Sequence, residues 1–247
     1  MKKQSTLYAI WVAGAAVVLA CIVALIWVAH ASGRSDVAQN SSEATGYGTV
    51  PTYTLVDQSG RKVHSSAFLG KVQVVSFLFP YCTSYCPLTA QHIVQVESAL
   101  QRAGLADRVQ FISFNVDPAG TGPKQMRAFM HEYGWPPSDT HWEYLTGSVA
   151  QIRRVVQQGY MVTYERESNA QEDREIARER KEGTYVPQPE VSNPLAKRAN
   201  VDYDIVHNDL LEVVGPRGHI RAIYLEADTV TADNIIAITN TLDSGRP

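Results

Sequence analysis

Cys82 and Cys86 are separated by three residues, at the point where an apolar run gives way to a predicted helix. Pro87 suits the first turn of that helix, because it lacks the N–H group that would be left unpaired there. Cys86 is therefore expected at a helix N-terminus, where the helix dipole favours a thiolate over a thiol. Two such thiols can form a disulfide or hold a soft metal ion. The third cysteine, Cys21, lies in an apolar N-terminal segment and is not expected to take part.

An inert disulfide between Cys82 and Cys86 is the simplest alternative. It would close a loop of about five residues, and the loop-entropy argument gives so short a loop little stabilisation. The pair also lies at a strand-to-helix switch, and ligand sites concentrate at the carboxyl ends of strands. Three cysteines in all are too few for a disulfide scaffold or a four-thiolate zinc site. A redox pair or a soft-metal site is therefore favoured.

A soft metal ion bound by two thiolates would take a third ligand, and the chain has seven histidines. His207 is on a predicted strand that leads into a hairpin, whereas His92 is predicted to face away from the start of the cysteine helix. The other five lie beside the apolar segment or in polar, turn-like surroundings: His30, His64, His131, His141 and His219. His207 is the candidate ligand, although a histidine in such a place is more often packed or exposed than a ligand.

Alternating strands and helices must position these side chains. The predicted strands and hairpins are 53–63 (a hairpin turning near Gly60), 72–79, 109–116, and a hairpin of 205–214 with 220–226. The predicted helices are 87–104, 123–133, 148–158 and 231–242. Residues 72–79 form a continuous apolar run that is typical of a strand buried on both faces. The pattern predicts an α/β sandwich of roughly 200 residues, spanning 48–247.

Residues 165–200 form a charged insertion within this domain. The segment is dense in charged residues of both signs, poor in apolar ones, and contains Pro187, Pro189 and Pro194. Its first half is compatible with an exposed helix, and its second half is predicted to be a loop. A solvated insertion is the simpler interpretation, and a surface that docks a partner is the alternative.

The N-terminal segment is predicted to be a membrane anchor. No Lys, Arg, Asp or Glu occurs from Gln4 to Gly33, and the apolar stretch 6–29 would span about 36 Å as a helix, against a hydrocarbon core of about 30 Å. Lys2 and Lys3 precede it, which predicts a cytoplasmic N-terminus. We expect a single-pass anchor over 1–30, a flexible tether over 31–47, and a domain on the periplasmic side of a bacterial-type inner membrane. Cleavage after Ala31 and lipidation at Cys21 are the alternatives.

Charge and composition exclude one class of partner. The chain has 22 Lys plus Arg and 25 Asp plus Glu, a net charge of −3. A nucleic-acid-binding protein would usually have a basic excess, so this chain is not expected to bind nucleic acid.

Four motifs together resemble the Sco/SenC family, whose members are membrane-tethered, thioredoxin-like copper proteins of cytochrome c oxidase assembly. They are Cys-x-x-x-Cys-Pro at 82–87, Val-Asp-Pro at 116–118, Asp-x-x-His at 204–207, and the Gly-Pro-x-Gly turn at 215–218. The resemblance covers about residues 48–245 together with the anchor. It implies a thioredoxin-like sandwich in which Cys82, Cys86 and His207 bind copper.

The chain departs from the family pattern at three positions. Thr83 stands where members usually have proline, Pro80 where they have threonine, and Gly215 where they have an aspartate. The charged insertion is also long. None of these departures removes a ligand, but they are compatible with a divergent paralogue that has another target.

The resemblance implies a metallochaperone that delivers copper to the extracytoplasmic copper centre of a terminal oxidase. Its partners would be the copper-site subunit of the oxidase, the membrane, and a thiol reductant or another copper carrier. A donor that releases its metal is expected to hold it in an exposed loop. The alternatives are a thiol–disulfide oxidoreductase acting on the cysteines of the oxidase copper site, with Cys82 and Cys86 as its redox pair, and a redox or copper sensor. The three-residue spacer, and the lack of a proline just before His207, argue against the oxidoreductase.

Overall fold

The computed structural model of the chain describes residues 47–136 and 138–243. The predicted anchor, and all of the predicted tether except Tyr47, lie outside the described residues. Within the described ranges, no helix is both long and apolar enough to cross a membrane.

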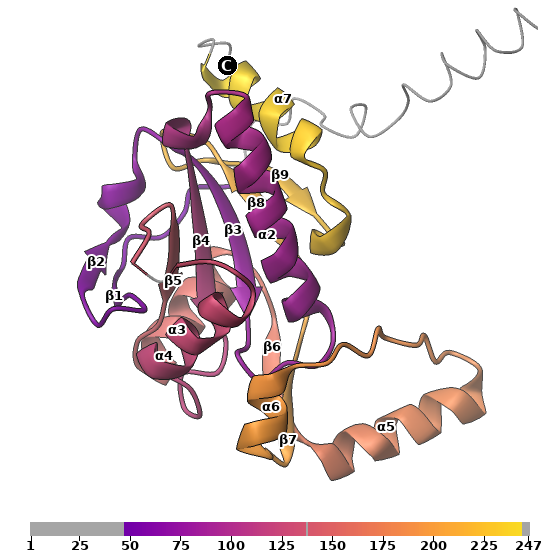
Figure 1. Ribbon diagram of the computed structural model, residues 1–247. Helices are drawn as coiled ribbons and strands as arrows, with labels where there is room; N and C mark the ends of the chain where they lie inside the picture. The colour runs from indigo at the N-terminus through magenta and orange to yellow at the C-terminus, as the bar shows by residue number, and fades with distance from the viewer. Residues whose placement is uncertain (1–46, 137, 244–247) are drawn as a thin grey trace, which may run out of the picture. The chain divides into compact units, whose positions relative to one another are not determined.

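A five-stranded mixed sheet forms the centre of the domain, in the order β5-β4-β3-β8-β9 (Figure 1). Its strands are β3 (Val72–Leu78), β4 (Val109–Asn115), β5 (Trp142–Leu145), β8 (Leu211–Val214) and β9 (Ile220–Tyr224). β3, β4 and β5 are parallel, and β8 is antiparallel to both β3 and β9. Every residue of β3 and β4 is buried, which confirms the two predicted central strands.

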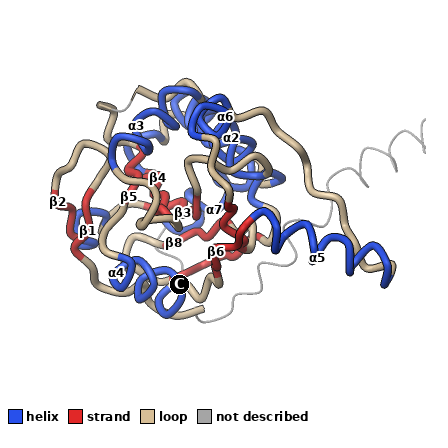
Figure 2. The backbone as a smooth tube through the Cα atoms, turned by 90° about the horizontal axis from the view of Figure 1, so that it is seen from below, coloured by secondary structure: helices blue, strands red, loops and turns tan. Residues whose placement is uncertain are grey.

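Helices cover both faces of this sheet. They are α2 (Tyr85–Arg102), α3 (Pro123–Glu132), α4 (Val149–Arg153, continued by a π-helix over Arg154–Gly159) and α7 (Ala232–Asp243). α2 and α3 lie on one face and α4 on the other (Figure 2). Phe129 of α3 packs against Tyr144 of β5, with ring centroids 6.1 Å apart. On the opposite face, Tyr160 packs against Phe77 at 5.8 Å. The small hairpin of β1 (Thr54–Val56) and β2 (Lys62–His64) is present as predicted.

The charged insertion is folded. It contains β6 (Tyr164–Ser168), α5 (Asn169–Glu182) and α6 (Pro194–Ala199), and it is followed by β7 (Tyr203–His207). α5 confirms the predicted exposed helix, and it extends away from the sheet in both views (Figures 1 and 2). The prediction that the second half is only loop is wrong, because Asn193 and Pro194 start α6.

The prediction of one strand over 205–214 is also wrong. β7 ends at His207 and pairs antiparallel with β6, while β8 starts at Leu211 and belongs to the central sheet. The chain therefore changes sheets between these two residues, and His207 ends a separate two-stranded ribbon.

Glu212 is a carboxylic acid in the interior of the sheet. It is fully buried on β8, opposite Val75 on β3 and Ile223 on β9. Neither of its carboxyl oxygens has a hydrogen-bond partner among the described residues. Burial raises the pKa of Glu212 from 4.5 to about 8, so the side chain is protonated in the folded protein at neutral pH.

This burial predicts a loss of stability as the pH rises. Below pH 4.5, Glu212 is protonated in both the folded and the unfolded chain, so its burial costs no ionisation energy. Between pH 4.5 and pH 8 the side chain ionises in the unfolded chain but not in the folded one, so the free energy of unfolding falls. Glu212→Gln removes this dependence, so the variant should gain on the order of 2–4 kcal/mol relative to wild type between pH 5 and pH 8. Thermal or urea unfolding of both proteins across this range measures the gap. Glu165→Gln, at an exposed strand position, is the matched control. A gap that stays constant with pH would contradict the prediction.

Candidate metal centre

The two cysteines are held by the turn that joins β3 to α2. Cys82 lies in this turn, and its backbone N–H donates to the carbonyl of Phe79 at 3.1 Å. The Sγ of Cys82 accepts from the backbone N–H of Ser84 at 3.4 Å, and the Sγ of Cys86 accepts from that of Phe79 at 3.4 Å. Backbone N–H groups therefore point at both sulfur atoms, which suits sulfur with partial or full negative charge.

His207 reaches Cys86 across 121 positions of the sequence, with 3.7 Å between Nε2 and Sγ. Its Nδ1 lies 2.9 Å from the carbonyl oxygen of Asn208, so Nδ1 donates its proton there. Nε2 is then left with its lone pair directed at the cysteine, which is the tautomer that a histidine needs to bind a metal ion through Nε2. Burial lowers the pKa of His207, which favours this neutral form.

A cluster of three side chains fastens the ribbon of β6 and β7 to the end of β4. The hydroxyl of Tyr203 donates to Oδ2 of Asp117 at 2.8 Å. The guanidinium carbon of Arg166 lies 3.4 Å from the centroid of the Tyr203 ring. Because Tyr203 is four residues before His207 on the same strand, this cluster sets where the imidazole lies. The Val-Asp-Pro motif pointed to Asp117, but no sequence pattern predicted Arg166 or Tyr203.

The two thiols have opposite pKa shifts. The hydrogen bond with Cys86 lowers the pKa of Cys82, and its contacts with Ser84 act in the same direction. Burial raises the pKa of Cys86. The expectation that the helix start would favour a thiolate at Cys86 is therefore wrong: burial raises the pKa of Cys86, and the pKa of Cys82 is the one that is lowered.

The cysteines are covered rather than exposed. Cys82 is 5% exposed and Cys86 1%, and both are free thiols. The expectation of an exposed loop site is wrong, because both cysteines are buried. In the same turn, Phe79 packs against Tyr81 and against Tyr203.

The structure brings the predicted ligands near one another without assembling a complete set. Cys86 contacts His207, and Cys82 hydrogen-bonds to Cys86. Among the residues of 47–136 and 138–243, no group of three or more His, Cys, Asp or Glu is placed so that it could hold a metal ion.

The insertion also touches the cysteine turn, through a residue that the sequence analysis missed. The side-chain amide of Asn193 donates to the carbonyls of Pro80 at 3.0 Å and Cys82 at 2.7 Å. Asn followed by Pro is a signal for a helix start, so the cap of α6 was readable from the sequence. The contact with a turn 111 positions away was not.

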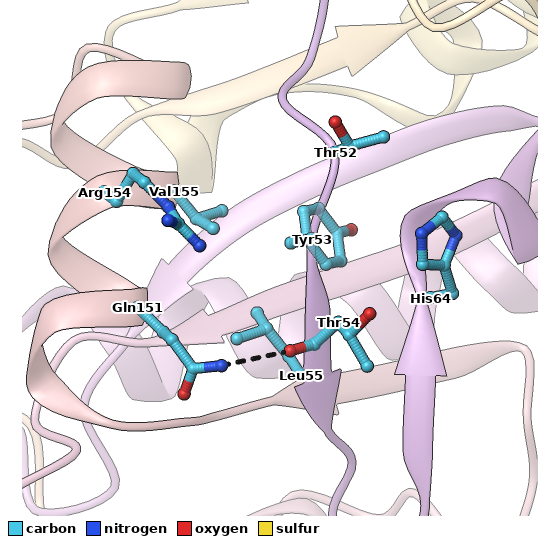
Figure 3. Close-up of a pocket in the computed structure, with 8 residues that line it drawn as sticks. All are labelled: Thr52, Tyr53, Thr54, Leu55, His64, Gln151, Arg154 and Val155. Atoms are coloured by element: carbon cyan, nitrogen blue, oxygen red, sulfur yellow. Dashed lines mark hydrogen bonds between the residues drawn. The ribbon is translucent and has the colours of Figure 1, made fainter.

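A surface pocket of about 260 Å³ lies elsewhere, between β1 and α4 (Figure 3). Its lining includes His64, and the side-chain amide of Gln151 donates to the Thr54 carbonyl at 3.4 Å across it. None of the three predicted ligands lines it.

Comparison with known proteins identifies the family. The sequence profile described as SCO1/SenC matches residues 41–190, a stretch that includes both cysteines and stops short of His207. The "SCO1 protein homolog" of Bacillus subtilis (strain 168) is 23% identical over 189 residues, which are 76% of this chain and 79% of the relative. The chain belongs to the SCO1/SenC family.

Solved structures share the fold. BsSco, described as a member of the Sco family of cytochrome c oxidase assembly proteins with a disulfide switch, is similar at a TM-score of 0.57 and 22% identity, over 82% of this chain and 96% of that one. Bradyrhizobium japonicum ScoI with copper bound is similar at a TM-score of 0.56 and 21% identity, over 79% of this chain and 99% of that one. These similarities and the mixed sheet confirm the thioredoxin-like α/β fold.

The pKa order predicts which cysteine reacts first. In the reduced full-length chain at pH 7, iodoacetamide should modify Cys82 faster than Cys86, because the thiolate is the reacting form. Peptide mapping by mass spectrometry separates the two sites, and it also separates Cys21. Equal labelling, or faster labelling of Cys86, would overturn the assignment.

Proposed function

We propose that this protein is a membrane-tethered metallochaperone that binds copper through Cys82, Cys86 and His207. The observation that supports this most strongly is the free Nε2 lone pair of His207, directed at the Cys86 thiol beside a second cysteine. Two thiolates and an imidazole suit Cu(I), which prefers soft ligands. A family relative whose structure contains bound copper adds support.

Copper is the cargo of this site, and the redox state of the cysteines would control loading. Cys82, with its lowered pKa, supplies a thiolate readily, and Cys86 loses its proton as the metal binds. A disulfide between them would leave no thiolate ligand, so loading needs a thiol reductant. The metal would then pass by ligand exchange to the copper-site subunit of cytochrome c oxidase.

We also propose that residues 1–30 anchor the protein as a single transmembrane helix, with 31–47 as a tether. Lys2 and Lys3 support an orientation that places the domain of 48–247 on the periplasmic side of the inner membrane. Delivery to an extracytoplasmic copper centre requires this side.

A thiol–disulfide oxidoreductase is the second candidate. The split pKa values of Cys82 and Cys86 favour it, because a reactive thiolate next to a buried thiol is what an exchange reaction needs. Its target would be the cysteines of the oxidase copper site. Rapid insulin reduction by a copper-free sample would favour this candidate.

Anaerobic Cu(I) titration of the reduced protein tests the proposal. Wild type should bind one copper ion, and Cys82→Ser, Cys86→Ser and His207→Ala should each weaken binding by at least roughly tenfold, because each removes one of three ligands. His131→Ala, at an exposed position on α3, should bind as wild type does. Unchanged binding in Cys82→Ser or His207→Ala would reject the proposal.

A further inference from the structure

We propose that Asn193 is a positioning residue through which the insertion fixes the main chain of the copper-binding turn. This inference rests on the proposed function of the turn, but it concerns a residue outside the ligand set. It gives the insertion a role in setting the copper affinity and the redox potential of the site.

Asn193 uses both ends of its amide. The nitrogen donates to the Pro80 and Cys82 carbonyls, while the oxygen accepts from the backbone N–H groups of Leu195 at 2.9 Å and Ala196 at 3.4 Å. The side chain is thus the N-cap of α6 and a clamp on the turn at once. Asn193 is 3% exposed, so its hydrogen bonds are shielded from competing water.

A second strap joins the same two segments. The backbone N–H of Val191 donates to the carbonyl of Thr83 at 2.7 Å. Three carbonyls of the turn, at positions 80, 82 and 83, therefore accept hydrogen bonds from the insertion. The turn departs from the family pattern at Pro80 and Thr83. Two of these three hydrogen bonds are therefore made at positions where the residue usual in the family is replaced.

α5 is attached less firmly. Every residue of α5 is at least partly exposed, and at its start the backbone N–H of Asn169 donates to the carbonyl of Asp202 at 2.9 Å. The chain then returns from the far end of α5 to α6, which lies beneath the start of α2 (Figure 1). The insertion meets the cysteine turn at this return, and Asn193 is its buried polar contact there.

The clamp acts on the backbone, because Asn193 bonds to the carbonyls of Pro80 and Cys82 and not to the Cys82 sulfur. The three ligands are not assembled into a complete set, so loading has to bring the Cys82 sulfur into place. With the main chain held at Cys82, side-chain rotation is sufficient, and little entropy is lost on binding. Without the clamp the turn has to be ordered as copper binds, and affinity falls.

The clamp also favours the dithiol, because it holds the main chain of the turn in the conformation in which Cys82 and Cys86 are free thiols. Oxidation joins the Cys82 and Cys86 sulfur atoms and releases two protons and two electrons, which reduce glutathione disulfide in a glutathione buffer. Loss of the clamp should therefore make the midpoint potential of the pair more negative.

Asn193→Ser tests the proposal. Serine keeps a neutral N-cap for α6 but has no amide to reach the two carbonyls. Losing two hydrogen bonds should lower Cu(I) affinity roughly tenfold. A tenfold shift in the thiol–disulfide equilibrium would move the potential by about 30 mV. Asn193→Ala should give the same two shifts, and in addition lower the melting temperature.

Asn200→Ala is the matched control, because it strains the other end of α6. Asn200 has a φ of 47°, which alanine tolerates poorly, and Asn200 has no contact with the turn among the interactions of the described residues. The control should keep the wild-type affinity and potential. Wild-type values in Asn193→Ser, or equal shifts in Asn200→Ala, would overturn the proposal. If wild type binds no Cu(I), the proposed function fails, and the potential alone decides whether the clamp exists.

Discussion

The whole site depends on the contact between Cys86 and His207, which the chain can make only by fixing two distant segments independently. Cys86 is placed by the carboxyl end of β3 and the first turn of α2. His207 is placed by the ribbon of β6 and β7, which is not part of the central sheet. The ribbon is fastened at Tyr203, whose hydroxyl bonds to the buried Asp117 at the end of β4. β3 and β4 are hydrogen-bonded neighbours, so the anchors of both ligands lie at one edge of one sheet.

Burial gives this site its electrostatic character. A helix start alone would make Cys86 the more acidic thiol, yet its surroundings exclude water and raise its pKa. The pKa of Cys82 is lowered instead, because Cys86 and Ser84 hydrogen-bond to its sulfur. A covered dithiol of this kind resists loss of its metal to water. Because Asn193 holds the main chain at Cys82, the Cys82 side chain is the part that has to move when copper enters or leaves.

Patterns within short segments predicted much of this structure. The continuous apolar runs of β3 and β4 and the spacing of α2 each identify one element without reference to the rest. β5, with only four residues, was missed because so short a segment has little periodicity. β6 was missed because none of its residues is buried, so its polar sequence shows no alternation. β7 was merged with β8 because only three residues separate the two strands.

The candidate site also contains some residues that the sequence predicted and others that it did not. Cys82 and Cys86 were identified by their spacing beside a helix start, whereas His207 needed the family resemblance, because one histidine on a strand has no distinguishing pattern. Arg166, Tyr203 and Asn193 act through contacts with residues far away in the sequence. No local pattern encodes such contacts, and burial, which reverses the pKa order of the cysteines, is also set only by the complete fold.

X-ray absorption spectroscopy of the reduced, copper-loaded protein tests the ligand set of Cys82, Cys86 and His207, because it identifies the atoms bound to the metal. Two sulfur ligands and one imidazole nitrogen around a single Cu(I) are predicted, with the imidazole signal lost in His207→Ala. A copper ion bound by sulfur alone, or an imidazole signal that persists in His207→Ala, would contradict the account.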